Sequence, residues 1–305
     1  MTKNAYCFCT AVYGSQYLKL ARFLAEDLCK FSPDSKLIIV TNQPSFFEDQ
    51  SNVIAIMHRC RGVEPHHERR FAINYGLSIS ESVIVIDSDV RILSPLPPDL
   101  KFNPGIAAKS CCSLQKHMQE RLKNPSKQKL RKQQIVHQMA EKVGVDMSSP
   151  DLKFINEFLF AVTRDQGREQ DFLNLWGELA IYADTLGMHR HPTYAMALAA
   201  HKTGFPVYKD EMPGLNFFDD RVIKWNIERG KAELTPQIEA LFKQQAEIED
   251  GQRSILPRIK RKLRKTMSKR VAIPYNRVRV KLTQAIAPSS LTAYSNADIE
   301  KFLRS

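Results

Sequence analysis

Glycine and long apolar runs are both scarce in this chain. Of its 305 residues only 12 are glycine, and the segment CTAVYGSQY, around the end of the first predicted strand, holds a single one. The fingerprint G-x-G-x-x-G of dinucleotide-binding folds is therefore absent there. No stretch approaches about 20 consecutive apolar residues, so no transmembrane helix is expected. The amino-terminal residues lack the apolar run of a signal peptide.

Cysteine spacing for a metal is missing as well. The chain has 6 cysteines but no C-x-x-C pair, and no histidine cluster stands at zinc-ligand spacing, so a structural zinc site is not expected. Cys7 and Cys9 alternate along the first predicted strand and would share one face. Small buried thiols of this kind are typical of a reducing cytosol, so we expect a cytoplasmic protein.

Acidic residues are absent from one segment near the carboxyl terminus. Lys and Arg total 45 against 33 Asp and Glu, which gives a net charge of +12. Residues 253–281 include twelve basic residues and no acid, so this segment accounts for the whole excess. The chain as a whole has a globular balance, with 43% hydrophobic and 26% charged residues. We predict a folded part at residues 1–250 and a basic segment at residues 251–305.

Apolar residues recur through the basic segment at helical spacing. Ile255, Ile259, Leu263 and Met267 stand four residues apart, and lysines and arginines fill positions between them. An apolar stripe edged by cations is typical of a helix at an anionic membrane surface. We therefore expect peripheral association with the inner face of the cell membrane, with a solvated or disordered tail as the alternative. Nucleic acid is a less favoured partner, because no zinc finger, helix-turn-helix or RNP-like aromatic set is present.

Strand-like and helix-like patterns alternate along residues 1–250. Apolar β-prone runs occupy residues 5–12, 36–41, 53–57, 82–90, 106–109, 154–163 and 205–208, and helical spacing occupies residues 15–28, 66–80, 171–184, 194–201 and 233–248. This alternation predicts an α/β fold whose mostly parallel sheet is covered by helices on both faces, in three layers. A second basic run, residues 116–142, predicts a long polar helix or a flexible excursion. Residues 211–225 predict an irregular segment.

Two acids end the strongest predicted strand. The run VIVI at residues 83–86 leads directly into Asp87 and Asp89. Their spacing puts both carboxylates on one side of an extended backbone, and buried charges must reach solvent, a cation or a hydrogen-bond donor. Two hard oxygen ligands suit Mg²⁺ or Mn²⁺, which would neutralise charge on a departing nucleoside diphosphate. A turn with two capping acids is the plainer alternative.

Three stretches together resemble the GT-A-fold glycosyltransferases that use nucleotide sugars, especially family 8 and its bacterial relatives. They are TAVYGSQYLKLARFLAEDL at residues 10–28, RRFAINYGLSISESVIVIDSDVRI at residues 69–92 and FINEFLFAV at residues 154–162. The resemblance implies a three-layer, Rossmann-like GT-A sheet with a basic helical appendage. It also implies transfer of a sugar from a nucleotide-sugar donor to an unknown acceptor, such as an envelope or lipid-linked glycan.

The resemblance implies roles for the residues at matching positions. The pair Asp87 and Asp89 would bind Mn²⁺ or Mg²⁺, and Glu157 would be the catalytic base or a hydrogen-bond acceptor for the sugar. The residues implied to contact the nucleotide sugar are Thr10, Ala11, Tyr13, Arg70 or its neighbour Arg69, Ser88 and Asn156. The family's usual third metal ligand, a histidine in His-x-x-Gly-x-x-Lys, has no counterpart here, although residues 216–221 and Asn226 lie in its region. Residues 189–191, His-Arg-His, could face the acceptor.

Two other classes of protein also fit parts of the sequence. A haloacid-dehalogenase-like phosphatase would use Asp87 as nucleophile and Asp89 as acid and base, with Lys202 and the acids 219–220 as its later motifs. Its acid pair, however, usually follows the first strand, and here it follows the fourth. The other class is a polyanion-binding protein without enzymatic activity, which would use the basic segment. Binding of nucleotide sugars would separate the glycosyltransferase from both.

Overall fold

The computed structural model describes residues 4–60, 63–97, 100–250 and 278. Apart from Val278, the basic segment and its predicted amphipathic helix lie outside the described residues. The division of the chain at residue 250 therefore stays a prediction. In the described part, no helix combines the length and apolar composition needed to cross a bilayer.

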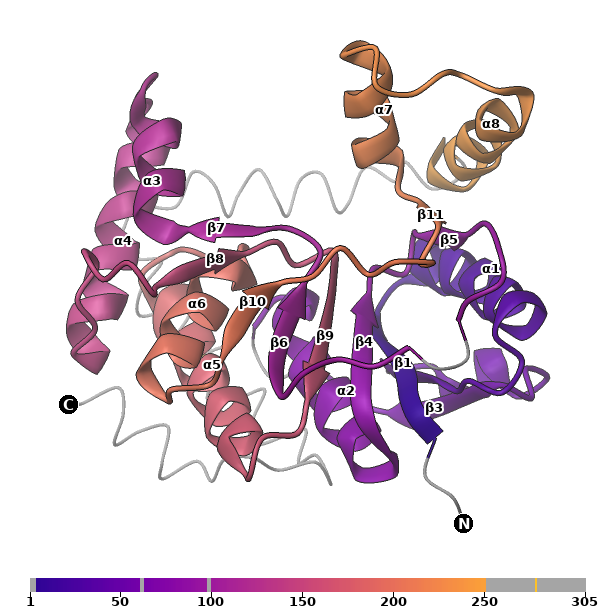
Figure 1. Cartoon of the computed structure of the whole chain (residues 1–305), viewed down its shortest axis with the longest axis horizontal. Coiled ribbons are helices and arrows are strands. Elements are labelled where there is room, and N and C mark those ends of the chain that lie inside the picture. The colour runs from indigo at the N-terminus through magenta and orange to yellow at the C-terminus, as the bar shows by residue number, and fades with distance from the viewer. Residues whose placement is uncertain (1–3, 61–62, 98–99, 251–277, 279–305) are drawn as a thin grey trace.

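A seven-stranded sheet forms the centre of the molecule (Figure 1). Its order is β10-β6-β9-β4-β1-β2-β3, and only β9 runs antiparallel to its neighbours. The strands are β1 (Asn4–Val12), β2 (Leu37–Thr41), β3 (Val53–Met57), β4 (Ser80–Ile86), β6 (Gly105–Ala108), β9 (Leu159–Thr163) and β10 (Val207–Lys209). The predicted α/β fold with a mostly parallel sheet is confirmed.

Alternating residues of the central strands face two separate cores. On β1, Cys7 and Cys9 belong to one buried cluster, while Tyr6 and Phe8 belong to the other. This period of two is what a strand buried on both faces produces. The first cluster packs under α2 (Pro65–Ile79), α5 (Arg168–Thr185) and α6 (Pro192–Lys202), and the second under α1 (Ser15–Phe31). Three layers result, as predicted.

Helix α2 lies unusually close to the sheet at Gly76. A Cβ atom at this position would lie 2.7 Å from a methyl group of Val83 on β4 and 3.0 Å from the sulfur of Cys7 on β1. The first distance is too short for any side chain, so α2 or Val83 would have to shift, and Cys7 would have to yield slightly. Gly76 therefore sets how near α2 packs to β1 and β4.

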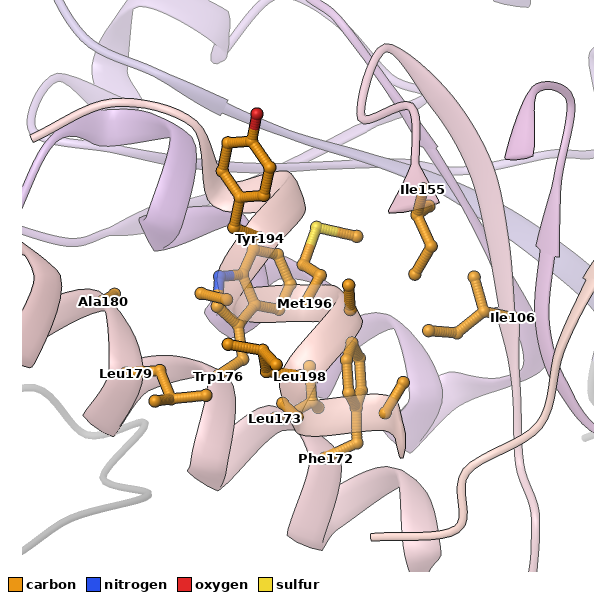
Figure 2. Packing of buried hydrophobic residues seen from close by; sticks show 14 of the residues in the cluster. Ile106, Ile155, Phe172, Leu173, Trp176, Leu179, Ala180, Tyr194, Met196 and Leu198 are labelled. Carbon is orange, nitrogen blue, oxygen red and sulfur yellow. The ribbon is translucent and has the colours of Figure 1, made fainter. Parts of the chain in front are cut away.

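Helices α5 and α6 build the apolar support beside the sheet. Trp176 and Phe172 of α5 pack against Met196 and Leu198 of α6, and the ring of Tyr194 extends away from this group (Figure 2). Trp176, Phe172, Met196 and Leu198 are fully buried. This packing fixes the first turn of α6, which carries Tyr194, against the sheet.

The predicted strand at residues 154–163 is two strands. Residues Lys153–Ile155 form β8, which pairs with β7 (Cys111–Ser113) in a separate two-stranded sheet, and β9 begins only at Leu159. Between them the amide of Asn156 donates to the carbonyl of Ser110 over 2.9 Å. The chain thus changes partner strands at residues 156–158, and Glu157 lies outside both ladders.

The predicted irregular segment at residues 211–225 contains regular structure. Residues Phe217–Phe218 form β11, which pairs with β5 (Arg91–Ile92), and α7 spans Asp220–Glu228. The expectation missed α7 because its start depends on a cap: the Asp219 carboxylate accepts the amides of Arg221 and Val222. The predicted helix at residues 233–248 is α8 (Pro236–Asp250). The short helix η1 spans Pro44–Phe47.

The second basic run forms two helices. They are α3 (Leu114–Leu122) and α4 (Lys127–Val143), and the hydroxyl of Ser126 caps the second one. Ile135, Val136, Met139 and Val143 are buried. Helix α4 therefore packs on the body of the molecule, next to α5 and α6, and is not a flexible excursion.

Candidate active site

The carboxyl ends of the first three strands open into one pocket. Tyr13 follows β1, Asn42 follows β2 and Met57 ends β3, and together with Arg59 and Cys60 they line a pocket of about 430 Å³. The three strands are parallel, so these residues meet at the same edge of the sheet. Crevices at this edge are where open α/β sheets bind ligands.

Tyr13 brings a neutral hydroxyl to this pocket. Burial raises its pKa well above the ordinary value, and the Glu68 carboxylate and the Cys60 thiol add to the rise. Burial, and then Glu68, likewise raise the pKa of Cys60 to about 12. Both groups therefore stay protonated and uncharged at neutral pH, and each can donate or accept a hydrogen bond.

Asp87 lies between two arginines at the end of β4. Its Oδ1 atom accepts a hydrogen bond from Arg69 of α2, and Arg221 of α7 donates to Oδ2 over 2.9 Å. Arg69 also donates to the backbone carbonyl of Glu157 over 2.8 Å. The same nitrogen of Arg221 lies 3.2 Å from the carboxylate of Asp219. Both oxygens of Asp87 are thus engaged by guanidinium groups.

Two nearby acids hold their protons more tightly than usual. Burial raises the pKa of Asp89 to about 6, and the charge of Asp87 adds to this more than Arg221 offsets. Burial also raises the pKa of Glu157, with Arg69 opposing the shift. The Oε2 atom of Glu157 is buried and has no hydrogen-bond partner among the described residues. Glu157 is therefore a carboxyl group with one unused oxygen beside the Asp87 centre.

The fit of a divalent cation to this centre can be tested on the contacts. Nowhere in residues 4–60, 63–97 and 100–250 do three His, Cys, Asp or Glu side chains come together to hold a metal ion. Arg221 contacts both Asp87 and Asp219, so a dication could bind Asp87 only in its place. As placed, the residues do not fit Mn²⁺ or Mg²⁺. Two guanidinium groups supply the positive charge beside the acid pair.

The other residues implied to bind the nucleotide sugar are only partly brought together. Tyr13 lines the pocket, but Thr10 and Ala11 do not, and the Thr10 hydroxyl is buried without a hydrogen-bond partner in the described structure. Ser88 is buried beside Asp87. Arg69 rather than Arg70 contacts Asp87, while the Arg70 guanidinium lies 4.0 Å from the ring centre of Phe71. These assignments stay predictions.

The histidines near the acceptor side differ in their contacts. His189 pairs with the buried carboxylate of Asp184, which gives it a structural partner. His191 instead lies 2.7 Å from the ammonium of Lys132 on α4. The sequence pointed to Arg221 only as part of residues 216–221, in the region of the third metal ligand, and it did not single out Lys132. Lys132 lies in a run that reads as a solvated helix face, and no local pattern marks a contact across 59 residues.

The phosphatase alternative needs a lysine that the fold places elsewhere. The Lys202 ammonium lies near Gly144, at the carboxyl end of α6. The amide of Thr193, at the other end of this 11-residue helix, bonds to the Glu157 carboxylate. A helix of this length spans about 15 Å. Lys202 is therefore remote from the Asp87 centre.

The fold and the site define an α/β protein with a pocket at the strand ends and a charged centre next to it. No protein-family model matches the chain, and no curated protein matches it. Among the solved structures that resemble the chain in part are three glycosyltransferase structures. The apo structure of the bifunctional glycosyltransferase WbbM is 11% identical, with a TM-score of 0.39 over 69% of this chain and 39% of its own. This chain thus matches well under half of the WbbM chain.

The galactosyltransferase LgtC, in complex with donor and acceptor sugar analogues, is 12% identical to this chain. Its TM-score is 0.40, over 66% of this chain and 72% of its own. An active-site variant of LgtC is also 12% identical, with a TM-score of 0.39 over 66% and 71%.

Proposed function

We propose that this chain is a glycosyltransferase that moves a sugar from a nucleotide-sugar donor to a glycan or other acceptor. The observation that carries the proposal is the pairing of a strand-end pocket with the charged centre at the end of β4. The first offers a place for a nucleoside. The second offers cations for a diphosphate and a carboxyl group, Glu157, for the acceptor.

The nucleoside end of the donor fits the pocket lined by Tyr13, Asn42 and Arg59. The Tyr13 ring offers a face for a base or ribose, and its neutral hydroxyl can donate a hydrogen bond. The amide of Asn42 can both donate and accept. A donor bound there would extend its phosphates along the same edge of the sheet, toward the end of β4.

The diphosphate would meet Arg221 at the charged centre. This side chain is 64% exposed, so its guanidinium can reach a ligand while Arg69 stays buried against Asp87. A guanidinium binds phosphate through two parallel hydrogen bonds and can stabilise charge on a departing diphosphate. Mn²⁺ or Mg²⁺ stays a prediction from the sequence, because such an ion would have to displace Arg221.

Glu157 is the carboxyl group that this proposal assigns to the acceptor hydroxyl. Its raised pKa brings it closer to neutral pH, where a carboxylate is a more effective base toward a hydroxyl proton. The Thr193 amide holds the carboxylate, and the partner-free Oε2 atom is available to a substrate. Glu157 therefore acts in this proposal as base or as hydrogen-bond acceptor for the sugar.

A thermal-shift panel of nucleotide sugars, run with Mn²⁺ and with EDTA, tests the proposed function. A bound donor should raise the melting temperature by an amount set by its concentration relative to its dissociation constant. Sugar transfer is then measured as release of the nucleoside diphosphate. Release of phosphate from a phosphomonoester with no effect of any nucleotide sugar would contradict the proposal and support the phosphatase.

A further inference from the structure

A group of basic side chains lies beside Glu157, and the proposed chemistry does not use it. Lys132 of α4 donates to the Nε2 atom of His191 over 2.7 Å, since an ammonium group can only donate. His191 has a φ of 81°, a left-handed conformation that few residues with a side chain adopt. Backbone strain of this kind is concentrated at functional sites in proteins, so the neighbours of His191 are candidates for a binding site.

Arg121 and His117 bring α3 to the same place. Arg121 hydrogen-bonds to the hydroxyl of Tyr194, the ring that extends out of the α5–α6 core in Figure 2. The His117 ring stacks on Phe154 with 3.6 Å between ring centres, and its Nε2 atom is buried without a hydrogen-bond partner in the described structure. Two helices thus direct basic and polar side chains at the start of α6.

Among the residues that the structure describes, no acidic side chain forms an ion pair with Lys132, Arg121 or Arg190. Burial first and neighbouring cations second lower the pKa of Lys132 to about 8 and those of His117 and His191 to about 4. Near neutral pH the two imidazoles are therefore neutral, while Lys132 and Arg121 carry positive charge that a bound anion would offset.

The basic group borders the reaction centre. Tyr194 follows Thr193, whose amide binds the Glu157 carboxylate, and Arg190 is close enough to His66 to lower its pKa together with Arg69 and Arg221. A molecule that offers a hydroxyl to Glu157 would therefore lie next to Arg121 and Lys132. The substrate that approaches Glu157 is the acceptor of the proposed transfer.

We propose that the acceptor is an anionic sugar whose phosphate or carboxylate binds among Lys132, Arg121, His117 and His191. This inference rests on the proposed function for the identity of the ligand as acceptor. A guanidinium, an ammonium and the ring nitrogen of His117 provide donors for two or three anionic oxygens. A neutral acceptor would leave the same cations crowded and without a counter-ion.

Calorimetric titration of the full chain with glucose 6-phosphate, glucuronate and glucose tests the anion site. The charged sugars should bind about tenfold or more tightly than glucose, since a charge-assisted hydrogen bond contributes on the order of one decade of affinity. Comparison of the two charged probes distinguishes a phosphate from a carboxylate acceptor. Equal binding of charged and neutral sugars, or no binding of either charged probe, would overturn the proposal.

Variants of α3 and α4 locate the site. Lys132→Gln and Arg121→Gln should each weaken binding of the charged sugar about tenfold, and Lys132→Arg should retain it. Lys127→Gln removes the same charge from the exposed start of α4 and should change affinity less than twofold. An equal loss in Lys127→Gln and Lys132→Gln would mean general charge attraction and would refute the site.

A parallel titration with a nucleoside diphosphate separates this inference from the proposed function. Lys132→Gln should leave diphosphate affinity unchanged, because Lys132 belongs to the acceptor side. If the sugar phosphate binds as expected but no nucleoside diphosphate binds, the anion site holds and the glycosyltransferase proposal fails. The opposite result keeps the transferase and rejects the anionic acceptor.

Discussion

Asp87 and Asp89 stand two residues apart but are held in different ways. Asp87 forms ion pairs with Arg69 and Arg221, whereas the charge of Asp89 is disfavoured by burial and by Asp87. Asp87→Asn leaves Arg69 buried without its counter-ion and should reduce the free energy of unfolding by about 3 kcal/mol. Asp89→Asn breaks no described ion pair, so the fold should stay intact, and a loss of transfer would support the metal-binding role that the sequence predicts for Asp89. Urea unfolding together with an activity assay measures both effects.

The raised pKa of Asp89 also predicts a pH dependence of stability. An unfolded aspartate titrates near about 3.9, and the folded value is about 6. The unfolded state therefore ionises first, so wild-type stability should fall as pH rises from about 4 to about 6. Asp89→Asn should lack this part of the fall. Identical pH profiles for wild type and variant would show that the pKa of Asp89 is not raised in the folded protein.

Substitution of Arg221 tests whether binding of a nucleoside diphosphate needs a metal ion. Wild type should bind a nucleoside diphosphate in EDTA, and Arg221→Gln should weaken this binding about tenfold through loss of a charge-assisted contact. Because the variant leaves Asp87 open on one side, Mn²⁺ should improve its affinity more than that of wild type. If Mn²⁺ strengthens wild-type binding more than tenfold, the sequence prediction of a metal is right and the role given to Arg221 is wrong.

Tyr13 should affect binding of the donor rather than the chemical step. Tyr13→Ala removes a ring contact made equally in the ground state and the transition state, so KM should rise with kcat little changed. Tyr17→Ala is the matched control, because Tyr17 lies in the first turn of α1 and is 46% exposed. Steady-state kinetics decides, and an unchanged KM for Tyr13→Ala would remove this ring from the nucleotide pocket.

At the scale of elements, the start of α7 positions Arg221. The Asp219 carboxylate caps two amides of the helix and also contacts Arg221. Asp219→Ala should cost about 1 kcal/mol of stability and should also reduce transfer. Thr235→Ala removes a comparable cap from α8, where the Thr235 hydroxyl accepts the Ile238 amide, and should leave transfer unchanged. Equal activities of the two variants would contradict a positioning role for Asp219.

Regular elements could be predicted from sequence where one periodicity runs without interruption. Strand β3 was predicted at its observed bounds, and β1, β2 and α2 within a residue or two. The break at Glu157 and the start of α7 were missed, because both depend on partners distant in sequence or on a cap. The acid pair was singled out from the strand that it ends and Glu157 from a resemblance, and both stay predictions as site residues. Lys132 could not, because its partner His191 is brought close only by tertiary packing.

At the scale of the whole molecule, we expect the basic segment at residues 251–305 to bind anionic membranes. Six Lys or Arg of residues 253–281, placed near an anionic bilayer, would each contribute about 1 kcal/mol to the free energy of membrane binding. Together they would be enough to hold the protein at the surface. Sedimentation with liposomes of graded anionic content should pellet the full chain at low salt, but not a chain ending at Gly251. Equal sedimentation of the two chains, or none at low salt, would reject membrane association.

The close approach of α2 to the sheet at Gly76 has a consequence for how the protein could diverge. One turn of this helix carries Glu68, beside the strand-end pocket, and Arg69, which binds Asp87. A methyl group at residue 76 would push the helix from β4 and carry both residues with it. A shift of α2 would therefore alter the pocket and the charged centre together. The loops after β1, β2 and β3 supply residues that line the pocket, so substitutions there can reshape it while α2 keeps its place.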